Sequence, residues 1–157
     1  MRGLRNFMIE LIKKFTDKEV IDFSKMIKVG DEFYLIEAGL RKIRDKVKSF
    51  PFFIGTYLGK RDKPSIFLLQ KLAQVAEKKV WVNEKGEWLF ICGRDILGQS
   101  LTKKDETVVK DDLVLVLNKH DECIGYGTFI DATKPKKAAV QRIFDIGDFL
   151  RRERKGK

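Results

Sequence analysis

The sequence predicts an α+β protein, with an N-terminal α/β domain that holds a mixed sheet at residues 1–76, followed by a small β-barrel at residues 77–157. Two observations support this class. The first half alternates apolar residues at helical spacing with short strand-like runs. The second half contains short apolar runs separated by glycine-containing or polar turns. The charged run Glu77-Lys78-Lys79 marks the predicted boundary between the two domains.

The first helix is predicted from apolar residues that recur at helical spacing, namely Leu4, Phe7, Met8, Leu11, Ile12 and Phe15. Residues 20–28 alternate between apolar and polar side chains, which favours a strand. Val29-Gly30-Asp31-Glu32 is then a predicted hairpin turn into a strand over residues 32–36. An alternative of second rank takes Thr16 and Glu19 as a capping box that opens a helix.

The rest of the N-terminal half is predicted as helix, strand and helix. Apolar residues with interspersed Lys and Arg indicate a second helix around residues 40–47, which Pro51 ends. Residues 52–59 have the composition of a strand, and their glycines suggest bends. Ile66-Phe67-Leu68 continues this extended segment, and a helix follows over residues 69–76.

The barrel strands are predicted in the order Lys79–Val82, Trp88–Ile91, Leu113–Leu117, Ile124–Ile130 and Val140–Phe144. The run Leu113–Leu117 is apolar throughout, as expected for a strand buried on both faces. His120-Asp121-Glu122-Cys123 closes a hairpin, and residues 146–150 begin a closing helical turn. Gly93 and Gly98 flank a predicted single helical turn, because such turns and helix ends favour positive φ.

Arg94 is a candidate anion contact within that glycine-bracketed turn. It would project from the loop at the helix start, where free backbone N–H groups favour an anion. The alternative is an ordinary surface arginine paired with Asp95 or Asp145.

The charge of the chain predicts an acidic partner. The formal net charge is +10 and the pI is near 9.6, which suggests nucleic acid or an anionic membrane. Residues 134–157 carry 9 basic and 3 acidic side chains, whereas residues 77–133 carry 8 basic and 11 acidic ones. A heat-adapted surface with ion-pair networks would explain the total charge, but a polyanionic partner better explains this imbalance.

Localisation is predicted from what the sequence lacks. No apolar run approaches the roughly 20 residues that a membrane span needs. Met8-Ile9 is followed by Glu10, Lys13 and Lys14, so the N-terminus does not resemble a signal peptide. We therefore expect a cytoplasmic protein with no membrane partner.

No catalytic constellation is visible. His120 is the only histidine and falls in a turn without a nearby nucleophile, which indicates an exposed turn residue. Cys92 and Cys123 show no zinc-ligand spacing, and Cys92 is expected to be buried as an apolar residue. Gly125-Tyr126-Gly127 lacks the third glycine of a dinucleotide site, so close packing in the barrel is the better interpretation. The sequence predicts no enzyme, no metal, no cofactor and no small-molecule substrate.

The candidate RNA contacts are basic side chains in three places along the chain. These are the loop before the last strand (Lys134, Lys136 and Lys137), the C-terminal tail (Arg151, Arg152, Arg154 and Lys155) and the glycine-bracketed turn (Arg94). Arginine suits this role because its planar donors match phosphate oxygens and it stacks on bases. The terminal arginines follow the apolar pair Phe149-Leu150, which we expect to anchor them beside the barrel. The alternative is that these charged residues lie in solvent at the end of the chain and bind no partner.

The order of elements after residue 78 resembles a PUA domain, a small β-barrel that binds structured RNA. Six landmarks in order extend the resemblance, namely Phe53–Lys60, Phe67–Leu69 with Leu72 and Ala73, Lys79–Val82, Gly93–Leu97, Ile124–Gly127 and Asp145–Arg151. Together they are similar to the Nip-seven family of 60S ribosome biogenesis factors, and the short lysine-rich chain is similar to its archaeal members. The resemblance is dense over residues 50–153 and loose before them.

The resemblance implies a non-catalytic RNA-binding factor in large-subunit assembly and pre-rRNA processing. It implies RNA (pre-rRNA or rRNA) on the basic PUA surface, with Arg151, Arg152 and Lys155 as its main contacts and Arg154 beside them. It also implies other ribosome assembly factors as partners, such as exosome or SBDS-type proteins.

Two other functional classes stay open. The chain could be a protein–protein adaptor in a pre-ribosomal complex, with anchors among Phe50, Phe52, Phe53, Tyr57 and Phe67. It could also be an accessory subunit of an RNA-modifying enzyme, although the N-terminal half is too short for a known catalytic domain of that kind.

Overall fold

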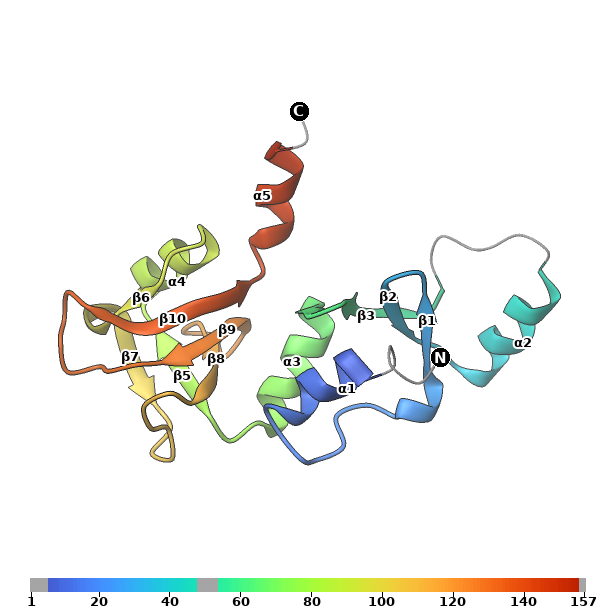
Figure 1. Cartoon of the computed structure of the whole chain (residues 1–157), viewed down its shortest axis with the longest axis horizontal. Coiled ribbons are helices and arrows are strands. Elements are labelled where there is room, and N and C mark those ends of the chain that lie inside the picture. Colours follow the sequence, from blue (N-terminus) through green and yellow to red (C-terminus); the bar gives the residue numbers. More distant parts are fainter. Residues whose placement is uncertain (1–5, 48–53, 156–157) are drawn as a thin grey trace.

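The computed structural model describes residues 6–47 and 54–155 and contains two sheets with helices between and beside them (Figure 1). The α-helices are α1 (Asn6–Lys13), α2 (Ala38–Lys46), α3 (Ile66–Val75), α4 (Glu84–Ile91) and α5 (Asp148–Lys155). The strands are β1 (Met26–Val29), β2 (Glu32–Leu35), β3 (Thr56–Lys60), β4 (Lys63–Pro64), β5 (Lys79–Val82), β6 (Ile96–Leu97), β7 (Leu101–Lys104), β8 (Leu113–Leu117), β9 (Cys123–Phe129) and β10 (Ala138–Asp145). Short 3₁₀ turns cover Phe23–Lys25 (η1) and Gly98–Ser100 (η2).

The N-terminal sheet has the strand order β1-β2-β3-β4, and every pairing in it is antiparallel. The mixed sheet expected in this half is therefore corrected to an antiparallel one. The predicted hairpin turn is confirmed, because Val29 pairs with Glu32 across Gly30, whose φ is +60°. The strand predicted over residues 20–28 begins only at Met26. Before it, the Asp22 carboxylate accepts a hydrogen bond from the Ser24 amide and caps η1.

The predicted helices of this half are confirmed at α1 and α2, whereas α3 begins earlier than predicted. Ser65 caps α3, since its hydroxyl oxygen accepts from the Leu68 amide at 3.2 Å. Residues 66–68 are therefore helical and do not extend the strand. The alternative helix at Thr16 does not form, because residues 16–22 contain no helix. The predictions that involve Leu4, Phe50, Pro51, Phe52 and Phe53 lie outside the described residues.

The C-terminal sheet has the order β6-β10-β9-β8-β5-β7 and curves into a nearly closed barrel. Its only parallel pairing among the described strands joins β5 to β8. The predicted strands at β5, β8, β9 and β10 are confirmed.

The strand predicted at Trp88–Ile91 is wrong, because this segment is the helix α4. Asn83 caps its first turn by accepting from the Gly86 amide at 2.8 Å, and Glu84 and Glu87 place carboxylates beside the N-terminus. The alternation that suggests a strand arises because Trp88 is 68% exposed while Phe90 is buried.

The glycines of β9 allow close contact with β10, as predicted from Gly125-Tyr126-Gly127. A Cβ atom on Gly125 would lie 2.1 Å from the Phe144 carbonyl oxygen, and one on Gly127 would lie 2.2 Å from that of Gln141. Gly125 also has a φ of +150°, which side chains rarely adopt. Close packing between these strands therefore requires glycine at both positions.

The two sheets share one apolar core, which lies around α1 and α3 between them (Figure 1). Leu69 and Leu72 of α3 belong to the same buried cluster as Leu115 of β8 and Tyr126 of β9. Polar contacts reinforce the junction. The Gln70 side-chain amide makes two hydrogen bonds to the backbone of Cys123, at 2.9 and 3.0 Å. Burial of this kind fixes the two parts of the chain relative to each other.

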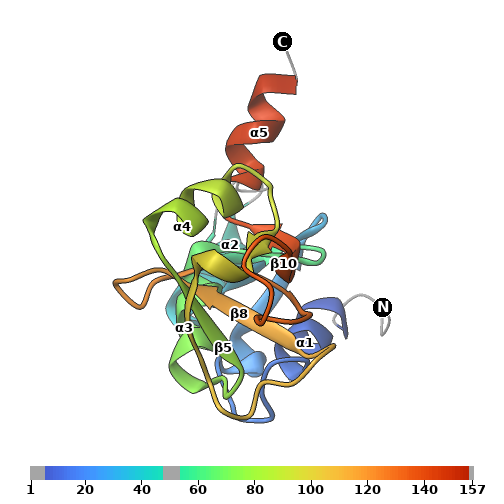
Figure 2. The same ribbon diagram turned by 90° about the vertical axis from the view of Figure 1, so that its left-hand side faces the viewer.

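Helix α5 projects from the body of the molecule in both views (Figures 1 and 2). The predicted closing turn is therefore a helix that runs to Lys155. The expectation that Phe149 and Leu150 anchor this segment is wrong, because the two residues are 66% and 60% exposed. The polar contacts of Asp145 hold the start of α5 instead, as described below.

Replacing Gly125 by Ala should lower the free energy of unfolding by more than about 1 kcal/mol, since the added methyl group meets backbone that cannot withdraw. The matched control is Gly39→Ala in α2, where nothing lies within 4 Å of the added atom. That change should be neutral or stabilise by up to about 1 kcal/mol. Urea denaturation followed by circular dichroism measures both, and equal effects of the two substitutions would contradict this account.

Candidate nucleic-acid interface

The carboxylate of Asp145 organises the start of α5. Asp145 ends β10 and its side chain is fully buried. It accepts from Arg142 at 3.0 Å and from two donors of Arg151 at 2.9 and 2.7 Å. The Gly147 amide adds a fourth hydrogen bond at 2.9 Å. A buried carboxylate needs such partners because its desolvation would otherwise cost several kcal/mol.

The same two arginines also complete the C-terminal end of α4. Gly93, with a φ of +91°, donates to the Phe90 carbonyl, and the Arg94 amide donates to that of Leu89. This pairing is a Schellman motif. Two further carbonyl oxygens accept from side chains, since Arg142 Nε donates to that of Gly93 at 3.1 Å and Arg151 donates to that of Ile91.

This arrangement corrects the predicted setting of Arg94. Arg94 follows the end of α4 and does not stand at the start of a helix, so an N-terminal anion site does not apply to it. Gly98 begins η2, and the helical turn predicted between the two glycines is absent from this described segment. Arg94 is exposed and makes no side-chain hydrogen bond or ion pair with the described residues, whereas Asp95 accepts from the Arg142 amide at 2.9 Å.

The predicted contacts Arg151 and Arg152 are both paired with carboxylates. Hydrogen bonds to Asp145 raise the pKa of the Arg151 guanidinium, whose side chain is 30% exposed. Arg152 bonds to Asp148, which also pairs with Lys63 at 3.1 Å. Burial raises the pKa of Asp148, but the hydrogen bonds from Arg152 and Lys63 outweigh it and hold this pKa below its usual value. Arg152 is 52% exposed and so keeps an open face.

The predicted lysines 134, 136 and 137 lie at the opposite end of β10 from α5 (Figure 1). All three are exposed, and their loop packs on η2 through hydrogen bonds from Gly98 to Lys137 and from Gln99 to Pro135, each 3.0 Å long. The eight residues of β10 span roughly 24 Å at the usual rise of a strand. The predicted residues therefore form two groups, with Arg94, Arg151 and Arg152 near α5 and the lysine loop apart from them.

Two of the predicted contacts cannot be placed, and one arginine was not predicted. Arg154 and Lys155 lie in α5, but their side chains are outside the described residues. Arg142 belongs to the cluster and was missed because it falls in a strand pattern. Its spacing of three residues before Asp145 is a weak signal, since the strand is irregular between Arg142 and Phe144.

The titratable side chains outside the Asp145 cluster form no metal centre among the described residues. No cluster of three or more potential metal ligands occurs among them. His120 is exposed, as predicted for a turn residue, whereas the prediction that Cys92 is buried is wrong, since Cys92 is exposed. Burial raises the pKa of the Cys123 thiol to about 12, so this thiol stays protonated. No described helix has the length and apolar character needed to cross a membrane.

Comparison with known proteins shows relatives along most of the chain. A family model described as the UPF0113 PUA domain matches residues 78–154. A UPF0113 protein of Archaeoglobus fulgidus is 29% identical over 113 residues, which cover 66% of this chain and 64% of that protein. The Danio rerio homolog of the 60S ribosome subunit biogenesis protein NIP7 is 32% identical over 140 residues, which cover 79% of this chain and 76% of that protein. The chain thus spans just under two thirds of the archaeal relative.

Solved structures share the fold over nearly the whole chain. A conserved PUA domain protein from Thermoplasma acidophilum has a TM-score of 0.57 and 19% identity, covering 97% of this chain and 93% of that one. A PUA domain from Aeropyrum pernix has a TM-score of 0.56 and 15% identity, covering 93% and 83%. The predicted α+β fold with a PUA-type barrel is thereby confirmed.

Replacing Asp145 by Ala should lower the free energy of unfolding by about 3 kcal/mol, because it leaves two partly buried guanidinium groups without their acceptor. The control is Glu37→Ala, which removes an exposed ion pair with Lys25 and should cost less than about 1 kcal/mol. Urea titration of the two variants compares them. A loss at Asp145 as small as that at Glu37 would show that the cluster does not hold α5.

Proposed function

We propose that this chain, which belongs to the NIP7 family together with the UPF0113 proteins, is a non-catalytic RNA-binding factor in the assembly of the large ribosomal subunit. The name of its Danio rerio relative, a 60S ribosome subunit biogenesis protein, supports the process, and the PUA family match supports RNA as the ligand. A role in pre-rRNA processing and binding to pre-rRNA or rRNA are part of this proposal.

The absence of enzyme activity is also proposed. It is supported by relatives named for subunit biogenesis, and the described residues hold no cluster of three or more potential metal ligands. The division into an N-terminal domain at residues 1–76 and a PUA domain at residues 77–157 belongs to the proposal as well. In it, the N-terminal part contacts other assembly factors, such as exosome or SBDS-type proteins.

The observation that carries the proposal is a set of exposed cations whose side chains make no ion pair with described residues. Arg94 and the lysine loop (Lys134, Lys136 and Lys137) fit this description. Unpaired cations bind phosphates at no cost of breaking an internal bond. Arg152 adds an open guanidinium face on α5. The tail residues Arg154 and Lys155 stay in the proposed interface.

Arg151 has a different part in the proposed interface. Its donors are directed at Asp145 and at the Ile91 carbonyl, and Gly93 lies against its guanidinium, since an added Cβ there would be 3.3 Å from Arg151 Cζ. We assign it the role of orienting α5 and the Gly93–Arg94 turn, while its exposed third faces the bound strand.

Replacing Lys134, Lys136 and Lys137 together by Ala should weaken binding of single-stranded RNA. If each lysine neutralises one phosphate, the slope of log affinity against log salt should become shallower by about 2. Fluorescence anisotropy of a labelled oligoribonucleotide at several salt concentrations measures this slope.

The matched control removes three exposed lysines elsewhere, Lys13 of α1 with Lys42 and Lys46 of α2. It changes the net charge equally and should leave the slope nearly unchanged. If both triple variants lose the same affinity, general charge and not a defined interface determines binding. If the wild-type protein binds no RNA, the proposed function is wrong.

A further inference from the structure

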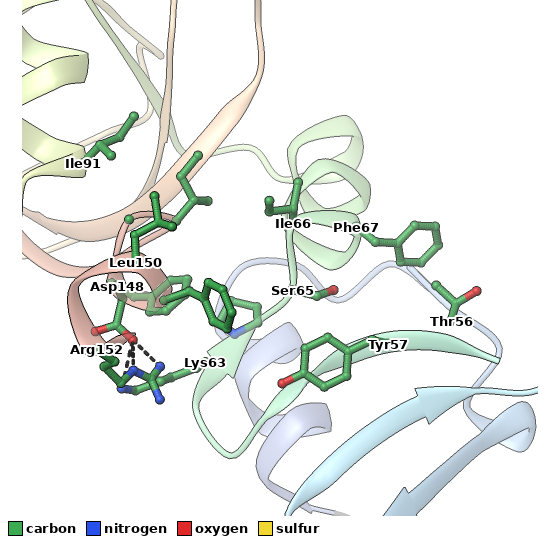
Figure 3. A pocket seen from close by; sticks show the side chains of 15 residues that line it. Thr56, Tyr57, Lys63, Ser65, Ile66, Phe67, Ile91, Asp148, Leu150 and Arg152 are labelled. Carbon is green, nitrogen blue, oxygen red and sulfur yellow. Dashed lines mark hydrogen bonds and ion pairs between the residues drawn. The ribbon is translucent and has the colours of Figure 1, made fainter. Parts of the chain in front are cut away.

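A groove with a volume of about 720 Å³ separates α5 from the N-terminal sheet and α3 (Figure 3). Tyr57 of β3 and Phe67 of α3 line one wall, while Phe149, Leu150 and Arg152 of α5 line the other. Figure 3 shows the Tyr57 ring directed toward the α5 side of the groove, whereas the Phe67 ring extends away from α5, toward Thr56. The volume lies within the usual range of about 300–1,000 Å³ for ligand sites.

The groove exposes large apolar side chains from three separate elements. Phe149 and Leu150 are more than half exposed, and Tyr57 and Phe67 are exposed by 38% and 37%. A contiguous apolar surface of this kind usually marks an interaction site. Because the shared core fixes α3 against β9, and Asp145 fixes α5 at the end of β10, both walls are held in place without an occupant.

The charges around the groove favour an acidic occupant. Lys63 and Arg152 line it and share the single lining carboxylate, Asp148. Lys71 lies next to it, with its ammonium 5.7 Å from the centre of the Phe67 ring. Three cations thus accompany one carboxylate. Tyr57 and Arg152 line the same groove, and burial raises the pKa of Tyr57 while the charge of Arg152 opposes this shift.

We propose that this groove binds an unstacked base of single-stranded RNA, with the adjoining phosphates held by Arg152 and Lys71. The inference rests on the proposed function and names the form of RNA that is recognised. Aromatic rings beside cations are the usual means of binding single strands, because every base offers a π-face and every phosphate a charge. Arg152 also belongs to the proposed basic interface, so a strand bound in the groove lies beside the basic residues near α5.

Replacing Phe149 by Ala tests the proposal with little risk to folding, because this side chain is mostly exposed. Affinity for a single-stranded oligoribonucleotide of about ten nucleotides should fall about 5- to 150-fold, the range for loss of one stacked base. Phe149→Tyr, which keeps a ring, should bind as the wild type does. Phe7→Ala removes an exposed aromatic outside the groove and should also bind normally.

A second oligonucleotide separates base binding from phosphate binding. It has the same length, but every base is replaced by an abasic ribose. The wild type should bind it more weakly than the intact strand, and Phe149→Ala should lower its affinity no further. An equal loss on both strands would overturn the base-binding proposal.

The outcomes also separate this proposal from the proposed function. If Phe149→Ala binds the intact strand normally while the lysine-loop variant binds weakly, RNA binding stands and the groove proposal is overturned. The groove would then belong to an acidic protein partner. If the wild type binds neither strand, the proposed function fails first, and the groove proposal fails with it.

Discussion

The buried carboxylate of Asp145 is the contact on which the functional end of the molecule depends. A charge without access to water must be neutralised and hydrogen-bonded inside the protein. Arg142 and Arg151 meet this requirement, and through it they join the end of β10, the end of α4 and the start of α5. Electrostatic contacts therefore hold α5 where it leaves the barrel, since its apolar residues Phe149 and Leu150 are mostly exposed.

This constraint divides the basic residues into two classes. Those near Asp145 are committed to internal bonds and shape the surface, whereas Arg94 and the lysine loop have side chains open to solvent. A large net charge thus does not translate directly into a large binding surface. The proposed interface depends on which cations keep donors exposed to solvent once the internal ion pairs of the fold have formed.

The sequence predicted those elements in which the spacing of apolar residues matches the burial that the structure shows. The strand Leu113–Leu117 is apolar on both faces and lies in the middle of the sheet, and Val29–Glu32 has the turn residues of a hairpin. Trp88–Ile91 was predicted wrongly because four residues cannot separate a strand from one turn of a partly exposed helix, and the cap at Asn83 decides the matter. The Asn83 and Ser65 caps are local signals that the sequence did contain.

The candidate site was less predictable for a physical reason. Residue type indicates which side chains are able to bind phosphate, but not which carboxylates they meet after folding. Arg151 and Asp145 are six positions apart, and their pairing depends on how β10 turns into α5. The groove was also beyond prediction, since its walls come from β3, α3 and α5, which the shared core and the Asp145 contacts bring together.

That shared core has a consequence for biosynthesis. Gln70 and Cys123 are 53 positions apart, and the apolar face of α3 is covered in part by β8 and β9. During translation, Leu69 and Leu72 therefore emerge well before the strands that shield them. We infer that the first half of the nascent chain cannot reach its final packing until β9 has left the exit tunnel, so the two halves mature as a single cooperative unit.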